Sequence, residues 1–104
     1  MGKKGDISEL TTLLSLALTH RIGSIVNPNE LYSEKYRKES DAFLKKAVKI
    51  SLRQNWNRYD KIKIRGLLEK KLRESLEKRD FLDKKKFEFM KEEIDDALKF
   101  LSLG

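Results

Sequence analysis

The segment between Arg53 and Arg65, RQNWNRYDKIKIR, holds the residue types in this chain best suited to contact another molecule. It combines five cations, one tryptophan and one tyrosine with a single carboxylate, that of Asp60. Cations neutralise phosphates along a nucleic-acid backbone, and aromatic rings stack on unpaired bases. We therefore predict a nucleic-acid contact made by Arg53, Trp56, Arg58, Tyr59, Lys61, Lys63 and Arg65.

A structural interpretation of the same segment stays open. Tryptophan is large and usually well buried, so in this interpretation Trp56 plugs the end of a helical bundle. The cations then only keep a joint between two helices soluble. If the contact is real, we expect it to be independent of base sequence, because the segment offers no set of Arg, Asn and Gln side chains typical of a base-reading helix. DNA and RNA are equally open as ligands.

A second candidate surface lies on a helix expected over residues 83–103. Phe89 and Phe100 are eleven residues apart, close to three helical turns, so we expect them to share a face. That face is distinct from the apolar seam of the same helix. It either packs inside the monomer or forms an interface with a second copy or a larger protein, through Phe89, Glu93, Asp96, Phe100 and Leu103. A protein-interaction subunit is therefore the alternative function.

Catalysis has little support in this sequence. The chain has one histidine, His20, and no cysteine, and it contains none of the common nucleophile, phosphate-loop or metalloprotease motifs. Glu88, Glu92 and Asp96 lie one helical turn apart, but one helix cannot surround a cation. We expect no enzyme activity, no cofactor and no metal site.

Composition fits a small, basic, single domain over residues 1–104. Charged residues make up 39% of the 104 residues, the net charge is +7, and such a composition is typical of thermophiles. Residues 53–79 hold ten basic and four acidic side chains, so the positive charge is concentrated there. No apolar run is long enough to span a membrane, and we expect a cytoplasmic protein without membrane contact.

Apolar residues recur every three or four positions, which predicts an all-α fold. Four helices are expected, over about residues 7–22, 27–54, 57–79 and 83–103. Their starts are indicated by the possible caps Asp6, Asn27, Asn57 and Asp80, and Asp60 stands in the capping-box position after Asn57. Gly23 with Pro28 is expected to end the first helix. The short connections favour a compact four-helix up-and-down bundle. A three-helix domain with an extra docked helix is the alternative.

Overall fold

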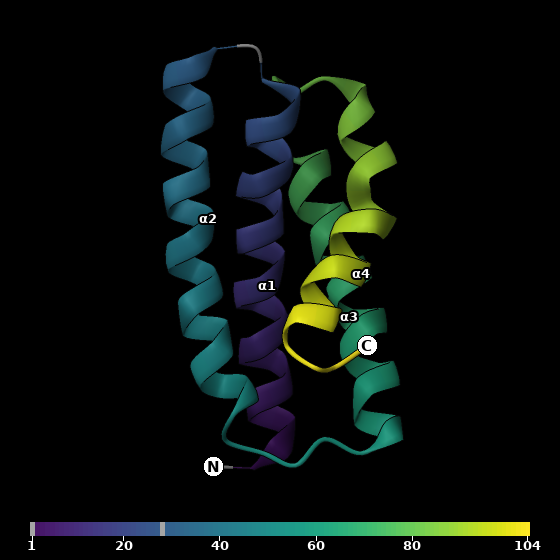
Figure 1. The fold of residues 1–104 in the computed structure, drawn as a ribbon. Coiled ribbons are helices and arrows are strands. Elements are labelled where there is room, and N and C mark those ends of the chain that lie inside the picture. Colours follow the sequence, from purple (N-terminus) through teal and green to yellow (C-terminus); the bar gives the residue numbers. More distant parts are fainter. Residues whose placement is uncertain (1, 28) are drawn as a thin grey trace.

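The computed structural model describes residues 2–27 and 29–104, and this described part contains helices and turns but no strand. The helices are α1 (Lys3–Val26), α2 (Glu30–Ser51), α3 (Arg58–Glu77) and α4 (Met90–Phe100), and a 3₁₀ helix, η1 (Lys84–Phe89), leads into α4. Successive helices run in opposite directions (Figure 1). The predicted all-α, four-helix up-and-down fold is therefore confirmed.

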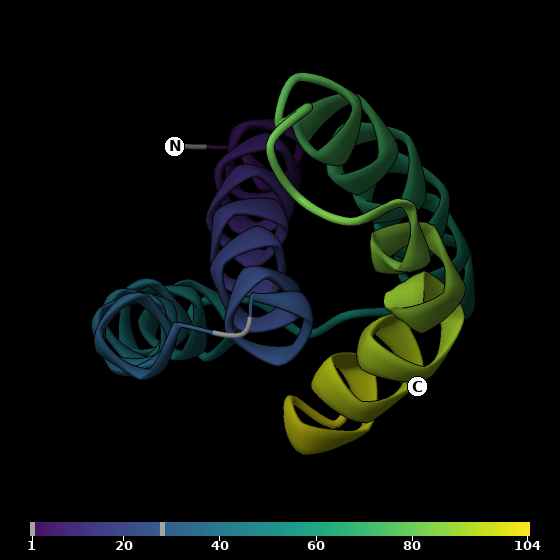
Figure 2. The same ribbon diagram turned by 90° about the horizontal axis from the view of Figure 1, so that it is seen from above.

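The four helices form an arc rather than a closed square. Seen along the bundle, the order is α2, α1, α3 and α4, and the arc is open between α4 and α2 (Figure 2). α1 packs against every other helix, whereas α2 approaches only α1 among the helices of the described chain. α1 is thus the central helix, and α2 has one neighbour where a closed bundle would give it two.

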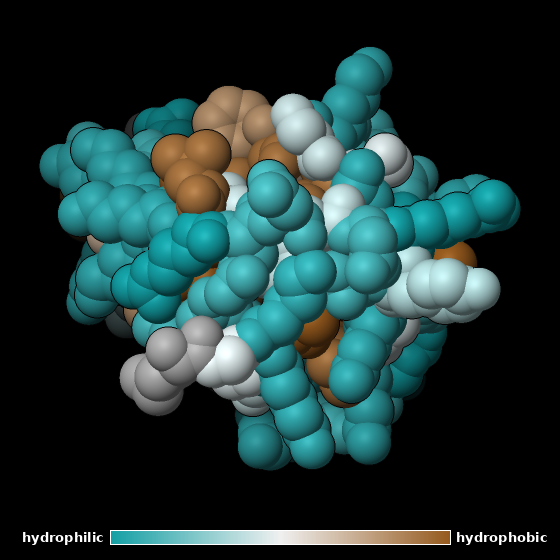
Figure 3. Space-filling model, turned by 90° about the horizontal axis from the view of Figure 1, so that it is seen from below, coloured by the Kyte–Doolittle hydropathy of each residue, from teal (hydrophilic) through white to brown (hydrophobic). Residues whose placement is uncertain are grey.

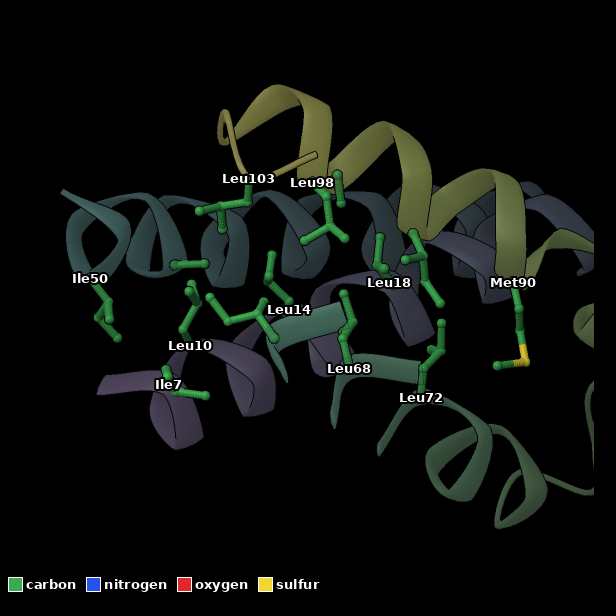
Figure 4. Packing of buried hydrophobic residues seen from close by; sticks show 14 of the residues in the cluster. Ile7, Leu10, Leu14, Leu18, Ile50, Leu68, Leu72, Met90, Leu98 and Leu103 are labelled. Carbon is green, nitrogen blue, oxygen red and sulfur yellow. The ribbon is translucent and has the colours of Figure 1, made fainter. Parts of the chain in front are cut away.

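The core lies where α1 faces α3 and α4 (Figure 4). The apolar stripe of α1 that the sequence predicted to be most buried is fully buried at Leu10, Leu14 and Ile22. It meets a stripe of α3 with spacing of four residues, and the predicted seam of α4 closes over both. The core positions of these two helices are Ile64, Leu68, Leu72, Leu76, Met90, Ile94, Ala97 and Leu98.

Both ends of α1 differ from the sequence prediction. The helix starts at Lys3 with Gly2 as its N-cap, so Asp6 lies in the first turn instead of capping it. Asp6 is buried and accepts a hydrogen bond from Gln54 at 2.9 Å. Gly23 does not end the helix, which continues to Val26. A methyl group at Gly23 would lie 2.7 Å from the ring of Tyr36, so glycine here permits close packing of α2.

α2 is capped by Asn29, whose side chain accepts hydrogen bonds from the N–H groups of Leu31 and Tyr32. The cap predicted at Asn27 is therefore wrong, and its side chain instead accepts from the N–H of Asn29 at 3.0 Å. The predicted role of Pro28 lies outside the described residues. Ser40 lies within the continuous helix α2, is buried, and donates to the carbonyl of Ala17 at 2.7 Å.

The C-terminal segment is less regular than the single helix expected over residues 83–103. Asp83, not Asp80, caps the 3₁₀ helix and accepts from the N–H of Lys85. α4 ends in a Schellman motif, in which Ser102 has φ of 58° and the N–H of Leu103 donates to the carbonyl of Leu98 at 2.7 Å. This turn folds Leu103 back into the core, where only 3% of it is exposed.

Candidate functional site

The first turn of α3 is fixed by the capping box that the sequence predicted. The Asn57 side chain accepts from the N–H of Asp60 at 2.9 Å, and the Asp60 carboxylate accepts from the N–H of Asn57 at 3.0 Å. Asp60 also pairs with Lys3 of α1 at 2.7 Å. The Lys3 ammonium and the Asn57 N–H, in that order of size, hold the pKa of Asp60 below its ordinary value. The one carboxylate of the segment is thus already neutralised by Lys3.

Three cations of the segment remain without a carboxylate partner in the described chain: Arg58, Lys61 and Lys63. Tyr59 belongs to the same first two turns of α3, with 84% of its surface exposed. Ile62 is also exposed, at 62%, one turn after Arg58 and Tyr59. Arg58, Tyr59, Lys61 and Lys63 are called the α3 patch below. Figure 3 looks onto this end of the molecule, where hydrophilic side chains cover most of the visible surface.

The other three predicted contact residues are engaged within the protein. Arg53 lies 3.5 Å from the carboxylate of Asp6 and 3.8 Å from that of Glu9. Arg65 pairs with Asp95 of α4. The expectation that Asp60 alone opposes the cations is therefore wrong, because it took no account of acids brought in from α1 and α4.

Trp56 fits the structural interpretation of the segment better than the nucleic-acid interpretation. It is partly buried against the hydrophobic core, and its Nε1–H donates to the carbonyl of Ser51 at 2.8 Å. That bond closes the connection between α2 and α3. The indole is therefore a structural part of the connection between α2 and α3, as its size suggested.

A hollow of about 410 Å³ adjoins the α3 patch. Its cations come from α3, and its apolar lining comes from α3, the end of α4 and the turn that follows α4. The lining residues are Arg58, Lys61, Ile62, Arg65, Leu98, Leu103 and Gly104. The patch therefore combines positive charge with an apolar surface, a combination that suits the backbone and the faces of unpaired bases.

The second predicted surface, on the C-terminal helix, is only partly exposed. Leu103 is buried by the Schellman turn, and Glu93 is buried with its carboxylate 2.6 Å from Arg21. Phe89 belongs to η1 rather than α4 and is partly buried against the core, so the α-helical spacing that placed it beside Phe100 does not apply. Asp96 and Phe100 are exposed, the latter at 67%.

A groove between α2 and α4 was missed by the sequence interpretation. It is a hollow of about 230 Å³ over α1, lined by Ala17, Leu18, Arg21, Ser40, Asp41, Leu44, Glu93, Asp96, Ala97 and Phe100. Leu44, Val48 and Leu52 recur every four residues on α2, away from the phase assigned to its core. That second apolar stripe was the signal for this edge of α2. That this edge of α2 lies near α4 could not be predicted from the residue pattern of a single helix.

Other chemically suited side chains are used within the protein. His20 places Nδ1 2.7 Å from the carbonyl of Leu16 and Nε2 2.8 Å from Glu39 of α2, so it links two helices. Among the side chains that the structure describes, no three His, Cys, Asp or Glu residues are grouped to hold a metal ion. Within residues 2–27 and 29–104, no helix has the length and apolarity that crossing a membrane requires.

Comparisons with known proteins give no relative from which a function could be carried over. No protein-family model, no curated protein and no solved structure matches this chain. The functional proposals below therefore rest on the charges and exposed side chains of the chain itself.

Proposed function

We propose that this protein binds nucleic acid without strong sequence preference, through the α3 patch. The observation that carries the proposal is that Arg58, Lys61 and Lys63 have no ion pair in the described chain and lie in the first two turns of α3, which also carry the exposed ring of Tyr59. Such a group attracts phosphates and offers a stacking surface. No catalytic step is part of the proposed function.

The energetic basis is the release of counterions from phosphates. An unpaired cation that contacts a phosphate contributes the full free energy of counterion release. Arg53 and Arg65 would first have to give up their ion pairs with Asp6 and Asp95. The contact is therefore smaller than the seven residues predicted from the sequence. If three phosphates are neutralised, the log–log salt slope on duplex DNA is about −2.7.

Tyr59 should favour a single strand over a duplex. Its ring stands out from the surface, where a base of an unpaired strand can stack on it, and a duplex offers no free base face. Replacing Tyr59 with Ala should reduce affinity for single strands by about 1–3 kcal/mol. The same change should leave the salt slope unchanged, because no charge is removed.

The test is a fluorescence titration of labelled single-stranded and duplex DNA and RNA across a salt series. The triple variant R58A, K61A, K63A should flatten the slope toward zero and weaken binding to all sequences alike. Its matched control is K78A, K84A, K85A, which removes the same charge from exposed positions at the opposite end of the bundle. The control should keep the wild-type slope.

Two results would contradict the proposal. One is binding weaker than about 1 mM at low salt for every nucleic acid tested. The other is an equal loss of slope in the triple variant and in its control, which would show a diffuse effect of net charge instead of a site. Circular dichroism of both variants checks that the substitutions leave the helices intact.

A further inference from the structure

The groove between α2 and α4 lies where the fold departs from a closed bundle, because these two helices do not pack against each other within the described residues. Its floor, Ala17 and Leu18, belongs to the core helix α1. Its mouth carries the ring of Phe100, which is 67% exposed. Apolar side chains gather where the edges of α2 and α4 face each other, at the upper left of Figure 3. The surface therefore offers both an apolar hollow and a projecting aromatic ring beside it.

The apolar character continues along α2 beyond the hollow. Leu44 lines the groove, and Val48 and Leu52 follow at intervals of four residues, so they extend the same edge of the helix. Leu52 is 80% exposed. α4 is short and ends at Phe100, so within the described residues α1 is the only helix beside this lower part of α2, and no helix covers its apolar edge (Figure 1). A helix from another molecule could lie there.

We propose that the occupant of this groove is a second copy of the same chain, related by a two-fold axis. The surface is self-complementary, because each copy supplies one exposed Phe100 ring and one apolar edge with a hollow to receive it. In a two-fold dimer both contacts form at once. The α4 edge of one copy then lies against the α2 edge of the other.

The charges on the edges of α2 and α4 support a second copy of this chain as the occupant of the groove. α2 holds six basic and four acidic residues, and α4 holds two lysines and four acids. Arg37 and Lys45 flank the α2 edge, are exposed and have no ion pair in the described chain, and they outnumber Asp41, an exposed acid that lines the groove on the same edge. Asp96 on α4 is likewise exposed and unpaired there. Placing α4 against α2 of the partner therefore brings opposite charges together on both sides of the axis.

The size of the face also suits a dimer. The molecule measures 40 × 21 × 21 Å, so one whole side parallel to the helices, of which the groove is a part, has an extent of the order of the ~800 Å² per partner that stable interfaces bury. An aromatic anchor in an apolar hollow is the usual centre of such an interface. Phe100 has this position here.

The test is sedimentation equilibrium of the full chain over a concentration series reaching about 1 mM. We expect a dimer of twice the 12.3 kDa chain mass. Phe100→Ser should raise the dimer dissociation constant by about 100-fold or more, because the symmetric interface loses two buried rings. Phe81→Ser is the matched control, since Phe81 is 69% exposed and lies outside the groove. It should change the constant by no more than about two-fold.

A cross-link locates the interface independently of the mass. The chain has no cysteine, so single cysteines can be introduced cleanly. A mixture of Asp96→Cys and Lys45→Cys chains should form a covalent dimer with a short bis-maleimide. A mixture of Asp96→Cys with Glu74→Cys, on the exposed outer side of α3, should not. A monomer throughout the series, a dimer unaffected by Phe100→Ser, or equal cross-linking of both mixtures would overturn the proposal.

Discussion

At the scale of single residues, two glycines inside helices have opposite roles. A methyl group at Gly23 would lie 2.7 and 2.9 Å from two ring carbons of Tyr36, whereas one at Gly66 would meet nothing within 4 Å. Both glycines cost the helix about 1 kcal/mol relative to alanine. Gly23 offsets that cost by letting α1 and α2 pack closely. At Gly66 no close contact within the described chain offsets it.

The pair Gly23→Ala and Gly66→Ala tests this difference. Gly66→Ala should raise the free energy of unfolding by about 1 kcal/mol, because helix propensity improves and no atom is displaced. Gly23→Ala should lower it, since overlap with a ring in packed surroundings costs about 1–3 kcal/mol and outweighs the same gain in propensity. Thermal unfolding followed by circular dichroism measures both, and a shift of about 4–8 °C per kcal/mol is expected. Equal shifts of the same sign would show that Tyr36 does not constrain Gly23.

At the scale of elements, the C-terminal turn decides which apolar side chains reach the surface. The Schellman motif requires a left-handed residue, and Ser102 supplies it with φ of 58°. This geometry turns Leu103 inward beside Leu98 and leaves Phe100 outside. An α-helix continued through residue 103 would have placed Leu103 on the outer face, as the sequence pattern predicted.

Replacing Ser102 with Gly should therefore stabilise the protein. Glycine adopts positive φ without the steric cost that a Cβ atom carries, so we expect a gain of about 0.5–1 kcal/mol in a urea titration. Lys99→Gly is the matched control, because residue 99 lies in regular α-helix, where glycine costs about 1 kcal/mol. A loss of stability in both variants would mean that the turn is not left-handed in solution.

At the scale of the whole molecule, stability should be distributed unevenly. Within the described residues, α1 packs against α2, α3 and α4, whereas α2 packs only against α1. α2 also exposes large apolar side chains, among them Leu31 at 80% and Tyr32 at 53%. A helix held on one side opens locally at a lower free energy than one held on several sides.

Native-state hydrogen exchange should show this order directly. Amides of α1 around Leu14 should exchange only through global unfolding, and those of α2 around Ala42 should exchange faster through local opening. If the second copy covers the α2 edge, protection of α2 should increase with protein concentration, and Phe100→Ser should remove that increase. Equal protection of α1 and α2 in dilute solution would contradict the view that α2 is attached on one side only.

The sequence by itself determined the class of the fold and most of its local signals. Apolar spacing predicted the buried stripes of α1, α3 and α4, and Asn57 with Asp60 predicted the capping box that starts α3. These features depend on residues within a few positions of each other, so local physical chemistry is sufficient to predict them. The residue types of the α3 patch could also be identified from the sequence, because they occupy neighbouring positions in one segment.

Only the tertiary structure decided which of those residues are free to act. Asp6 and Asp95 come from other helices to pair with Arg53 and Arg65, and Lys3 comes from α1 to neutralise Asp60. The open groove likewise exists because α2 and α4 diverge on either side of α1. Ion pairs and grooves between distant segments depend on how the helices are arranged in space, which spacing within one helix cannot specify.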